Sequence, residues 1–436
     1  MKLLGKNREE ARRAVTEGHA TIAVYGLGKM GLPLAAAFAD AGARVIGVDV
    51  NAELVDKINS GECPLAGEPG LAEAITRGTT SGRLSATTDG VAAASEADLC
   101  AILVPTSLTQ KNGVCAPDQG AVASVARAIA EGLGAGGIVV TECTMPPGST
   151  EALVPLFSKH GRVLNEDYGL AHCPERTMSG TALRDIRGEY PKIIGASSPA
   201  ALEAVAGVYE AVNSKGVIAC SSIKTAELVK IFEGVYRDAN IALANELAQV
   251  CREEDVDFNE IREKANTQPY CRILQSGCGV GGHCIPVYPH FIMRETTPLI
   301  RLARQVNDSM PREAVALTEK ALAKRGRKLA GARVLVLGLT FRGGVKEFAN
   351  SCALPIIREL KARGAQAFAF DPLCSAGDYE RLGVRESRDF SSMDAAIIAT
   401  DHAEFKATDW DALGISVLVD GRGIVKKFAS GELVKM

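Results

Sequence analysis

The sequence predicts an α/β protein with two Rossmann-like, doubly wound domains, joined by a long central helix and a helical middle domain. Three observations predict this fold. An apolar strand runs into glycines at residues 21–31, helical periodicity persists through residues 224–250, and a second series of apolar strands begins near residue 331. Strands that alternate with helical stretches are typical of parallel sheets with helices on both faces.

The length of 436 residues is too great for one ordinary core and predicts several domains. We expect an N-terminal helical leader at 1–20 and a dinucleotide-binding Rossmann domain at 21–215. A central helical domain at 216–325 and a second Rossmann-like domain at 326–436 are expected to follow.

The first βαβ unit carries the most specific nucleotide signal. Its strand, "TIAVY", leads into "GLGKMG", a helical stretch follows, and a second strand closes at Asp49. The G-x-G-x-x-G spacing of Gly26, Gly28 and Gly31 permits a tight turn, close approach of a pyrophosphate, and tight packing of helix on strand. Lys29 lies inside this turn.

Met30 completes the predicted turn, so residues 26, 28–31 and Asp49 are the candidate cofactor contacts. An acid at the end of the second strand accepts hydrogen bonds from ribose hydroxyls and disfavours the 2′-phosphate of NADP, so NAD is expected. FAD uses the same fingerprint and is the alternative cofactor. A glycine turn that binds nothing is the structural alternative.

Three polar loops follow predicted strands: "VPTS" (104–107), "ECTMPPGST" (142–150) and "CPERTMSG" (173–180). Ligands of a doubly wound sheet bind at this edge. The candidates there are Thr106, Thr144, Glu175, Arg176 and Thr177.

The long helical stretch 224–250 places Lys230, Gly234 and Arg237 on one face. A lysine among apolar neighbours acts as a general acid or base with a lowered pKa, or as an electrostatic partner for an oxyanion. The alternative is a solvated lysine on an amphipathic helix.

The second α/β region has strands at 332–340, 366–372, 394–400 and 415–421. It lacks the glycine fingerprint of the first, so the sequence shows no internal repeat in motif terms.

The stretch "GCGVGGHCIPVYPHF" surrounds Cys284 with glycines, including Gly281. A cysteine nucleophile needs an exposed thiolate and room for its adduct, and backbone without Cβ supplies that room. The alternative is a structural loop with an inert cysteine.

Composition excludes several classes. Apolar residues make up 47% and charged residues 23%, and the net charge of −3 gives no reason to expect nucleic acid. No run approaches the roughly 18 apolar residues of a membrane helix, and the N-terminus lacks a signal peptide's apolar core. The twelve cysteines show neither a CxxC pair nor zinc spacing, so we expect reduced thiols, no metal site and a cytoplasmic location.

The order of these motifs resembles the UDP-glucose/GDP-mannose dehydrogenase family over essentially the whole chain. "CPER" and "GGHCIP" are most similar to the branch that oxidises UDP-N-acetylhexosamines. The resemblance implies NAD-dependent oxidation of the C6 hydroxyl of a UDP-sugar, with UDP-N-acetylmannosamine the first expectation, to a carboxylate. It also implies a homodimer formed through the central helix and UDP bound by the second Rossmann-like domain.

The resemblance further implies the site roles. Cys284 attacks the C6 aldehyde, Lys230 steadies the oxyanion and Glu175 assists the proton and water steps. The implied substrate contacts, some of them near the glycine loop, are Arg176, Thr177, Arg237, Arg272, Gly281, Phe341 and Arg342.

This chain departs from the family pattern at four positions. Gly234 replaces an Asn four residues after the lysine, Tyr288 replaces an Asp four residues after the cysteine, Arg342 replaces a Lys and Ala349 replaces an Arg. A tyrosine of ordinary pKa cannot act as a carboxylate base at neutral pH. UDP-glucose or UDP-N-acetylglucosamine therefore remains an alternative substrate, and an enzyme that performs one alcohol–carbonyl step, or a silent nucleotide-sugar binder, remains an alternative function.

Overall fold

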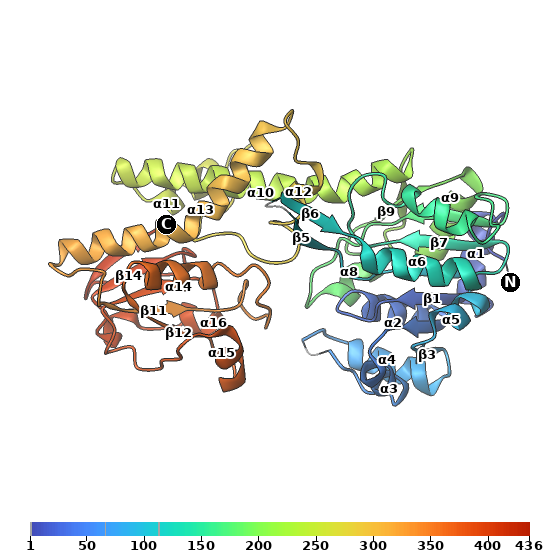
Figure 1. Cartoon of the computed structure of the whole chain (residues 1–436), viewed down its shortest axis with the longest axis horizontal. Coiled ribbons are helices and arrows are strands. Elements are labelled where there is room, and N and C mark those ends of the chain that lie inside the picture. Colours follow the sequence, from blue (N-terminus) through green and yellow to red (C-terminus); the bar gives the residue numbers. More distant parts are fainter. Residues whose placement is uncertain (1, 66, 112–113) are drawn as a thin grey trace. The chain divides into compact units, whose positions relative to one another are not determined.

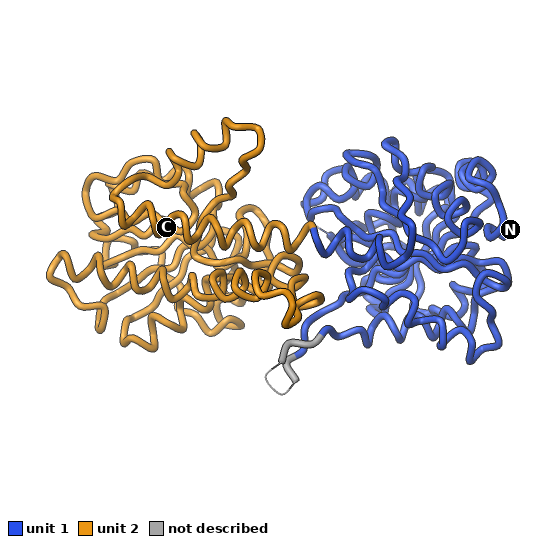
Figure 2. The backbone as a smooth tube through the Cα atoms, turned by 90° about the horizontal axis from the view of Figure 1, so that it is seen from above, with its two compact units in different colours: residues 1–232 blue, residues 233–436 orange. Residues whose placement is uncertain are grey.

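The computed structural model describes residues 2–65, 67–111 and 114–436. The chain divides into two compact units, residues 1–232 and 233–436 (Figure 2). Helix α10 (Ile223–Glu253) contains the boundary between them. The predicted four-part division of the chain stays a prediction.

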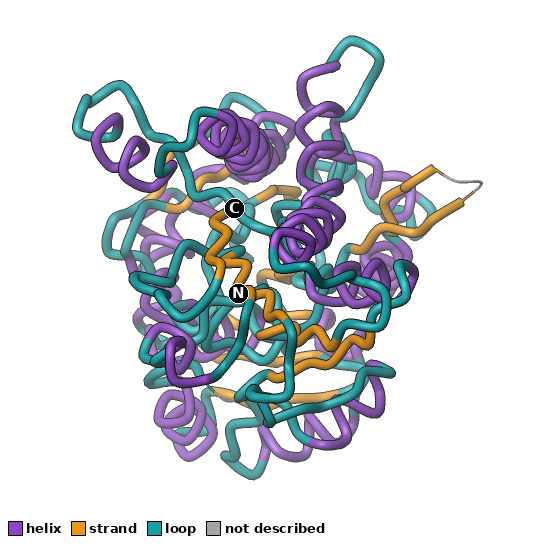
Figure 3. The backbone as a smooth tube through the Cα atoms, turned by 90° about the vertical axis from the view of Figure 1, so that its left-hand side faces the viewer, coloured by secondary structure: helices purple, strands orange, loops and turns teal. Residues whose placement is uncertain are grey.

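Unit 1 is built on an eight-stranded sheet in the order β10-β9-β8-β7-β4-β1-β2-β3 (Figure 1). Its strands are β1 (Thr21–Tyr25), β2 (Arg44–Val48), β3 (Leu84–Thr87), β4 (Leu99–Ile102), β7 (Gly137–Thr141), β8 (Tyr168–His172), β9 (Lys192–Ala196) and β10 (Val217–Ala219). The strands predicted at 21, 43, 99 and 137 are confirmed. The predicted parallel sheet is confirmed for most of its strands, and β9 and β10 run in the opposite direction, because β9 pairs antiparallel with β8 and parallel with β10. A separate two-stranded ribbon, β5 (Ser107–Lys111) and β6 (Val114–Asp118), also pairs antiparallel (Figure 3).

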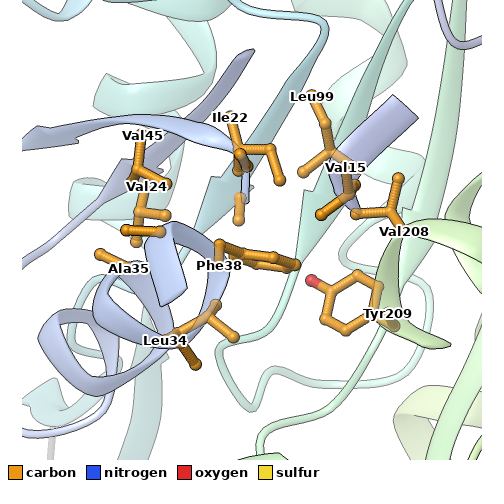
Figure 4. Packing of buried hydrophobic residues seen from close by; sticks show 14 of the residues in the cluster. Val15, Ile22, Val24, Leu34, Ala35, Phe38, Val45, Leu99, Val208 and Tyr209 are labelled. Atoms are coloured by element: carbon orange, nitrogen blue, oxygen red, sulfur yellow. The ribbon is translucent and has the colours of Figure 1, made fainter. Parts of the chain in front are cut away.

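Both faces of this sheet are covered, as the alternation of β1 shows. Ile22 and Val24 lie in one buried cluster, and Ala23 and Tyr25 lie in another. Figure 4 shows the first cluster, in which the ring of Phe38 meets Tyr209 edge-on at 5.5 Å. The helices of unit 1 are α1 (Arg8–Thr16), α2 (Gly31–Ala41), α3 (Ala52–Asn59), α4 (Leu71–Thr80), α5 (Gly90–Glu96), α6 (Gly120–Gly132), α7 (Val154–Ser158), α8 (Ala182–Gly188) and α9 (Pro199–Glu210), with a 3₁₀ turn at Glu151–Leu153.

The N-terminal leader packs onto unit 1 through α1. A Cβ at Gly207 in α9 would lie 2.1 Å from the carbonyl oxygen of Arg8, so the two helices touch at backbone distance. The guanidinium of Arg8 pairs with Glu203 at 2.9 Å and Glu210 at 3.3 Å, both on α9. The leader is therefore part of the fold of unit 1.

Helices α10 and α13 (Pro298–Lys324) pack together within unit 2, the latter with Pro311 inside it. Buried polar side chains fix their register: Asn245 donates to Asn307 at 3.0 Å, and Arg304 pairs with Asp238. The short helices α11 (Phe258–Ala265) and α12 (Pro289–Ile292) lie between them in the chain.

The second sheet of the chain is five-stranded and entirely parallel, in the order β12-β11-β13-β14-β15. Its strands are β11 (Arg333–Leu337), β12 (Gln366–Phe370), β13 (Ala395–Ile398), β14 (Val417–Asp420) and β15 (Glu432–Lys435), with α14 (Ala353–Ala362), α15 (Ala376–Leu382), α16 (Ala403–Lys406) and a 3₁₀ turn at Trp410–Leu413. The four predicted strands are confirmed, and the predicted fold class with them.

The turn after the first strand repeats in the two folds although the glycine motif does not. Gly26 donates its N–H to Val48 and has φ 93°, and Gly338 donates to Phe370 and has φ 92°. In each fold the next N–H is held by an aspartate, which is Asp371 in unit 2. Gly26 and Gly31 correspond to Gly338 and Gly343, but Thr340 stands at the middle glycine, so the second turn lacks the complete G-x-G-x-x-G motif.

Candidate active site

In the glycine turn after β1, the fold requires two of the glycines but does not require the third. A Cβ at Gly26 would lie 2.6 Å from the carbonyl oxygen of Leu103, and one at Gly31 would lie 1.8 Å from that of Gly26. Gly28 is exposed and has nothing within 4 Å of an added Cβ. The open backbone at Gly28, in front of the N-terminus of α2, suits the close approach of a pyrophosphate.

Asp49 is fixed at the end of β2 by two backbone donors. Its Oδ2 accepts from the N–H of Leu27 at 2.9 Å, and its Oδ1 accepts from that of Asn51 at 3.0 Å. The half-buried carboxylate keeps further lone pairs for ribose hydroxyls. The residues of this turn therefore fit NAD, with the open Gly28 as the deciding observation.

The loops after β4 and β7 meet at Thr106 and Thr144. The hydroxyl of Thr106 donates to the carbonyl oxygen of Thr144 at 2.7 Å. Behind them, the buried carboxylate of Glu227, on α10, accepts from the N–H groups of Gly148 at 2.5 Å and Thr150 at 2.9 Å. Gly148 has φ 89°, which only glycine adopts without strain, so α10 and this loop are joined at a required turn.

Glu175 lies in the loop after β8 and is nearly buried. Its Oε1 accepts from the N–H of Thr177 at 2.6 Å, and its Oε2 accepts from the ammonium of Lys192 at 3.1 Å. Burial by itself raises the pKa of this carboxyl, but the Lys192 charge, the Thr177 N–H and the charge of Lys230 outweigh burial and hold the pKa below its ordinary value. Glu175 is therefore an anion at neutral pH.

Lys230 is buried on α10 and acts electrostatically on Glu175, so the structure brings these two predicted residues into one site. The fingerprint turn joins the same region, since the hydroxyl of Thr177 donates to the sulfur of Met30 at 2.9 Å. Lys29 is exposed on the turn. The predicted cofactor turn and the predicted acid thus lie side by side in unit 1.

Arg176 is engaged by its own loop. Its guanidinium donates to the carbonyl oxygen of Pro191 at 2.6 Å and lies 5.0 Å from the ring centre of Tyr190. These contacts hold the "CPER" loop against the segment before β9. A role for Arg176 in binding substrate stays a prediction.

Cys284 lies in unit 2 and is the one exposed cysteine among the side chains that the structure describes. Its carbonyl oxygen accepts from the N–H groups of Val287 and Tyr288, each at 3.0 Å, so the thiol stands at the start of a tight turn before α12. The inert-loop alternative would bury the sulfur or leave it on an irregular segment. Exposure on an ordered turn favours the nucleophile.

The glycines of this loop let it lie against the loop after β11. A Cβ at Gly281 would lie 2.8 Å from the Cβ of Phe341, and one at Gly282 would lie 3.0 Å from the Phe341 ring. The side chain of Asn350 donates to the Gly282 carbonyl oxygen at 3.0 Å. The predicted substrate contacts Gly281 and Phe341 are therefore neighbours.

Arg342 extends this group, with its guanidinium 5.9 Å from the ring centre of Phe341. Arg422, which follows β14 and was not predicted, donates to the carbonyl oxygen of Phe341 at 3.4 Å. Arg237 and Arg272 are exposed in the same unit. The sequence had predicted Arg237, Arg272 and Arg342 as cations that contact an anionic substrate. Arg422 carried no sequence signal except its position after a strand.

Two of the departures from the family pattern contact each other. Gly234, on α10, faces the ring of Tyr288, and a Cβ at position 234 would lie 2.5 Å from Cδ2 of that ring. Tyr288 is buried. The absence of a side chain at 234 is thus required by the tyrosine at 288.

Sequence reasoning missed the buried partners of Glu175. Lys192 and Glu142 are both buried, and the ammonium lies 3.5 Å from Oε2 of Glu142. The signal was present but weak: each is a charged residue at the end of an otherwise apolar strand.

The Rossmann turn, its aspartate and the adjoining acid and lysine define a dehydrogenase that uses a dinucleotide. Three family models match the chain in order. They describe the NAD-binding domain (residues 20–213), the central domain (224–309) and the UDP-binding domain (335–427) of the UDP-glucose/GDP-mannose dehydrogenase family. The chain belongs to this family and is an NAD-dependent UDP-sugar dehydrogenase, so the FAD alternative does not apply.

Individual relatives match nearly the whole chain. A UDP-N-acetyl-D-mannosamine dehydrogenase of Pyrococcus horikoshii is 36% identical over 93% of this chain and 96% of its own. An NDP-N-acetyl-D-galactosaminuronic acid dehydrogenase of Ralstonia nicotianae is 34% identical, over 94% of this chain and 98% of its own. Among solved structures, a UDP-D-ManNAc dehydrogenase from Pyrococcus horikoshii has a TM-score of 0.88 at 33% identity, covering 95% of this chain and 98% of that one.

Proposed function

We propose that this chain oxidises the C6 hydroxyl of UDP-N-acetylmannosamine to the carboxylate. The observation that carries the proposal is the exposed thiol of Cys284. It lies in a glycine-rich loop that packs against Phe341, in a chain whose first βαβ turn fits NAD. Relatives whose printed activity is on UDP-N-acetylmannosamine support the choice of sugar.

The cofactor's part is simple, because bound NAD accepts the hydride removed from C6 in each oxidation. Asp49 would bind its ribose, and the open backbone at Gly28 would receive the pyrophosphate. Thr106 and Thr144 are joined by a hydrogen bond at the same sheet edge, where they would contact the remainder of the dinucleotide.

The chain's own chemistry centres on Cys284. After the first oxidation its thiolate adds to the C6 aldehyde, forming a C–S bond and an oxyanion that Lys230 stabilises and that takes up a proton. The second oxidation of this thiohemiacetal leaves a thioester. Water oriented by Glu175 adds to the thioester carbonyl, the C–S bond breaks and the thiol is released. One alcohol, two NAD and one water give one acid, two NADH and two protons.

The decisive experiment measures NADH per sugar on a panel of UDP- and GDP-sugars, with the product identified by mass. Two NADH per UDP-N-acetylmannosamine and an acid product are expected. The Cys284→Ser variant is expected to lose acid formation, while Cys271→Ser, a half-buried cysteine of the same unit, retains it. One NADH per sugar with recoverable aldehyde contradicts the four-electron proposal.

A second candidate, a single alcohol–carbonyl step, is favoured by the packing of Tyr288 over Gly234. This packing leaves neither an amide at 234 nor a carboxylate at 288 to serve a hydrolytic step. The same product analysis separates the two candidates.

We also propose that the chain forms a homodimer through α10. Tyr236, Leu243 and Val250 recur every seven residues on this helix and are about half exposed, which fits a second copy of the same helix. Light scattering is expected to give a dimer that Leu243→Glu dissociates and that Ile261→Glu, an exposed apolar site on α11, leaves intact. A monomeric wild-type protein contradicts it.

Two findings bear on the location of the protein. Every cysteine whose side chain is described is a free thiol, which supports a reducing compartment such as the cytoplasm. Among the described residues, no helix has the length and apolarity to cross a bilayer.

A further inference from the structure

Behind Glu175 lies a buried polar cluster that the proposed mechanism does not use. Its other members come from three elements: Glu142 follows β7, Lys192 begins β9, and Tyr209 lies near the end of α9. Their exposed fractions are 0%, 4% and 1%, against 9% for Glu175. Glu175 is thus the least buried member of the cluster.

The cluster forms one continuous chain of hydrogen bonds. Tyr209, whose ring lies in the apolar core, donates its hydroxyl to Oε1 of Glu142. The ammonium of Lys192 reaches Oε2 of Glu142 at 3.5 Å and Oε2 of Glu175 at 3.1 Å. With the Thr177 N–H on Oε1, both oxygens of Glu175 are held, so the plane of its carboxylate is set from within the protein.

When both acids are ionised, Glu142 has to share the ammonium of Lys192 with Glu175, whereas Glu175 is also stabilised by the charge of Lys230. A buried charge without a full partner is costly, and a group in that position gains or loses a proton instead. Burial raises the pKa of Glu142 to about 7, with Lys192 opposing the rise and Glu175 adding to it.

Among the described residues, Glu142 interacts electrostatically with Lys192, Glu175, Tyr209, Cys173 and Cys143. Burial raises the pKa of both thiols and, together with the Glu142 charge, that of Tyr209, so these three stay neutral. The pKa of Lys192 is raised, because both carboxylates outweigh its burial, so it stays charged. Glu142 is therefore the member of the cluster that changes charge near neutral pH.

We propose that Lys192 is a positioning residue for Glu175, and that the proton on Glu142 sets how strongly Lys192 holds it. With Glu142 protonated, the ammonium serves Glu175 alone. With Glu142 ionised, the ammonium is divided between two carboxylates and a second negative charge stands nearby, so Glu175 becomes a better acceptor for the proton of a reacting water. This inference rests on the proposed function, since it assigns Glu175 to the water step.

The first test is the pH dependence of turnover in Glu142→Gln, which keeps the shape and hydrogen-bonding capacity of the protonated acid. Interacting groups move one another's pKa by about one unit, so kcat of the wild type is expected to rise about threefold to tenfold through neutral pH. The variant is expected to lose this rise and keep the low-pH value, with the KM for NAD unchanged. A variant that retains the rise overturns the proposal.

The second test removes the cation. Lys192→Met alone removes the one ammonium that contacts both buried carboxylates and is expected to fold poorly, so Lys192→Met is combined with Glu142→Gln. We expect kcat to fall about 100-fold from misorientation of Glu175, with the KM for NAD unchanged, and Lys192→Arg to retain most of the activity. Lys57→Met, which breaks an exposed pair with Glu53 in the same unit, is the matched control and is expected to act as wild type. A folded double variant with wild-type kcat overturns the proposal.

The third readout needs no turnover and so separates this inference from the proposed function. In infrared difference spectra, the carbonyl band of a protonated buried carboxyl is expected to disappear as the pH rises from about 5 to about 9, and to be missing in Glu142→Gln. This result in a protein that oxidises no UDP-sugar supports the cluster and refutes the function. A band that does not respond to pH overturns the cluster.

Discussion

The contact between Gly234 and Tyr288 predicts strong energetic coupling between two positions 54 residues apart in the sequence. The perturbation is Gly234→Ala, made alone and in a Tyr288→Ala background. The added Cβ would lie 2.5 Å from Cδ2 and 3.3 Å from Cβ of the tyrosine, far inside van der Waals contact, so the buried ring has to move.

The magnitude follows from two opposing effects. Overpacking a buried site costs about 1–3 kcal/mol, whereas replacing glycine by alanine inside a helix gains about 1 kcal/mol. Gly234→Ala is therefore expected to be neutral to about 2 kcal/mol destabilising in the wild type. It is expected to be about 1 kcal/mol stabilising once the ring is absent, which gives a coupling free energy of about 1–3 kcal/mol.

The assay is thermal unfolding of the four proteins of the cycle, where about 1 kcal/mol moves Tm by about 2–4 °C in a unit of this size. Gly377→Ala, at a helical glycine with open space around it, is the control and is expected to show no coupling to Tyr288→Ala. If the effects of Gly234→Ala and Tyr288→Ala add, the ring does not occupy the space above residue 234. In that case the explanation of the two departures is wrong.

Three further predictions follow from single sites. Asp49→Asn keeps the acceptor for the Leu27 N–H but loses the charge, so the KM for NAD is expected to rise about tenfold and the preference over NADP to shrink; unchanged kinetics with both cofactors would contradict the ribose contact. Gly148→Ala places a side chain at φ 89°, so Tm is expected to fall by several degrees; a Tm equal to that of the wild type refutes the strain. Burial lowers the pKa of His172 from 6.5 to about 3, so its contribution to stability is complete above pH 6.5 and is lost as the pH falls toward 3. The His172→Asn variant is expected to lose up to about 1.4 kcal/mol per pH unit of acid dependence in denaturant unfolding, and identical slopes refute the burial argument.

The sequence predicted the fold because its strands carry local signals. The strand, glycine turn and acid of the first βαβ unit, and the four strands of the second fold, all come from short apolar runs bounded by turn residues. The reversal of β9 could not be predicted in this way, since strand direction depends on long-range pairing that periodicity does not encode. Helix α13 lies within the helical region predicted at 216–325, but its bounds were not predicted, because Pro311 lies inside it and interrupts the helical pattern.

The site residues that the sequence named come from motifs. Cys284, Glu175 and Lys230 stand in motifs that made them candidates, the family resemblance supplied their roles, and these roles stay predictions. Lys192 and Glu142 act through contacts between strand ends that are 50 residues apart, and only the folded sheet brings them together. In the sequence, Gly234 and Tyr288 likewise appear as two separate departures from the family pattern, because their contact forms only in the folded chain.

The two Rossmann-like folds share a turn but differ at its middle glycine position, and this difference predicts which of them binds the dinucleotide. Gly28 has open space around it, whereas the matching position in unit 2 is Thr340, whose hydroxyl bonds to Asp371 and His402 and fills the turn. A side chain at position 28 is thus compatible with the fold and incompatible with a pyrophosphate. Gly28→Ala is expected to leave Tm unchanged and to weaken NAD binding at least about tenfold in calorimetry.

The matched control for this substitution is Gly26→Ala, at φ 93° with the Leu103 carbonyl oxygen 2.6 Å from the new Cβ. It is expected to lower Tm by several degrees, because a side chain there strains the backbone and collides with an atom that cannot move. The pair separates a glycine that the ligand needs from one that the chain needs. If Gly28→Ala binds NAD as the wild type does, the pyrophosphate does not approach the backbone of this turn, and an open glycine is then no evidence of a ligand.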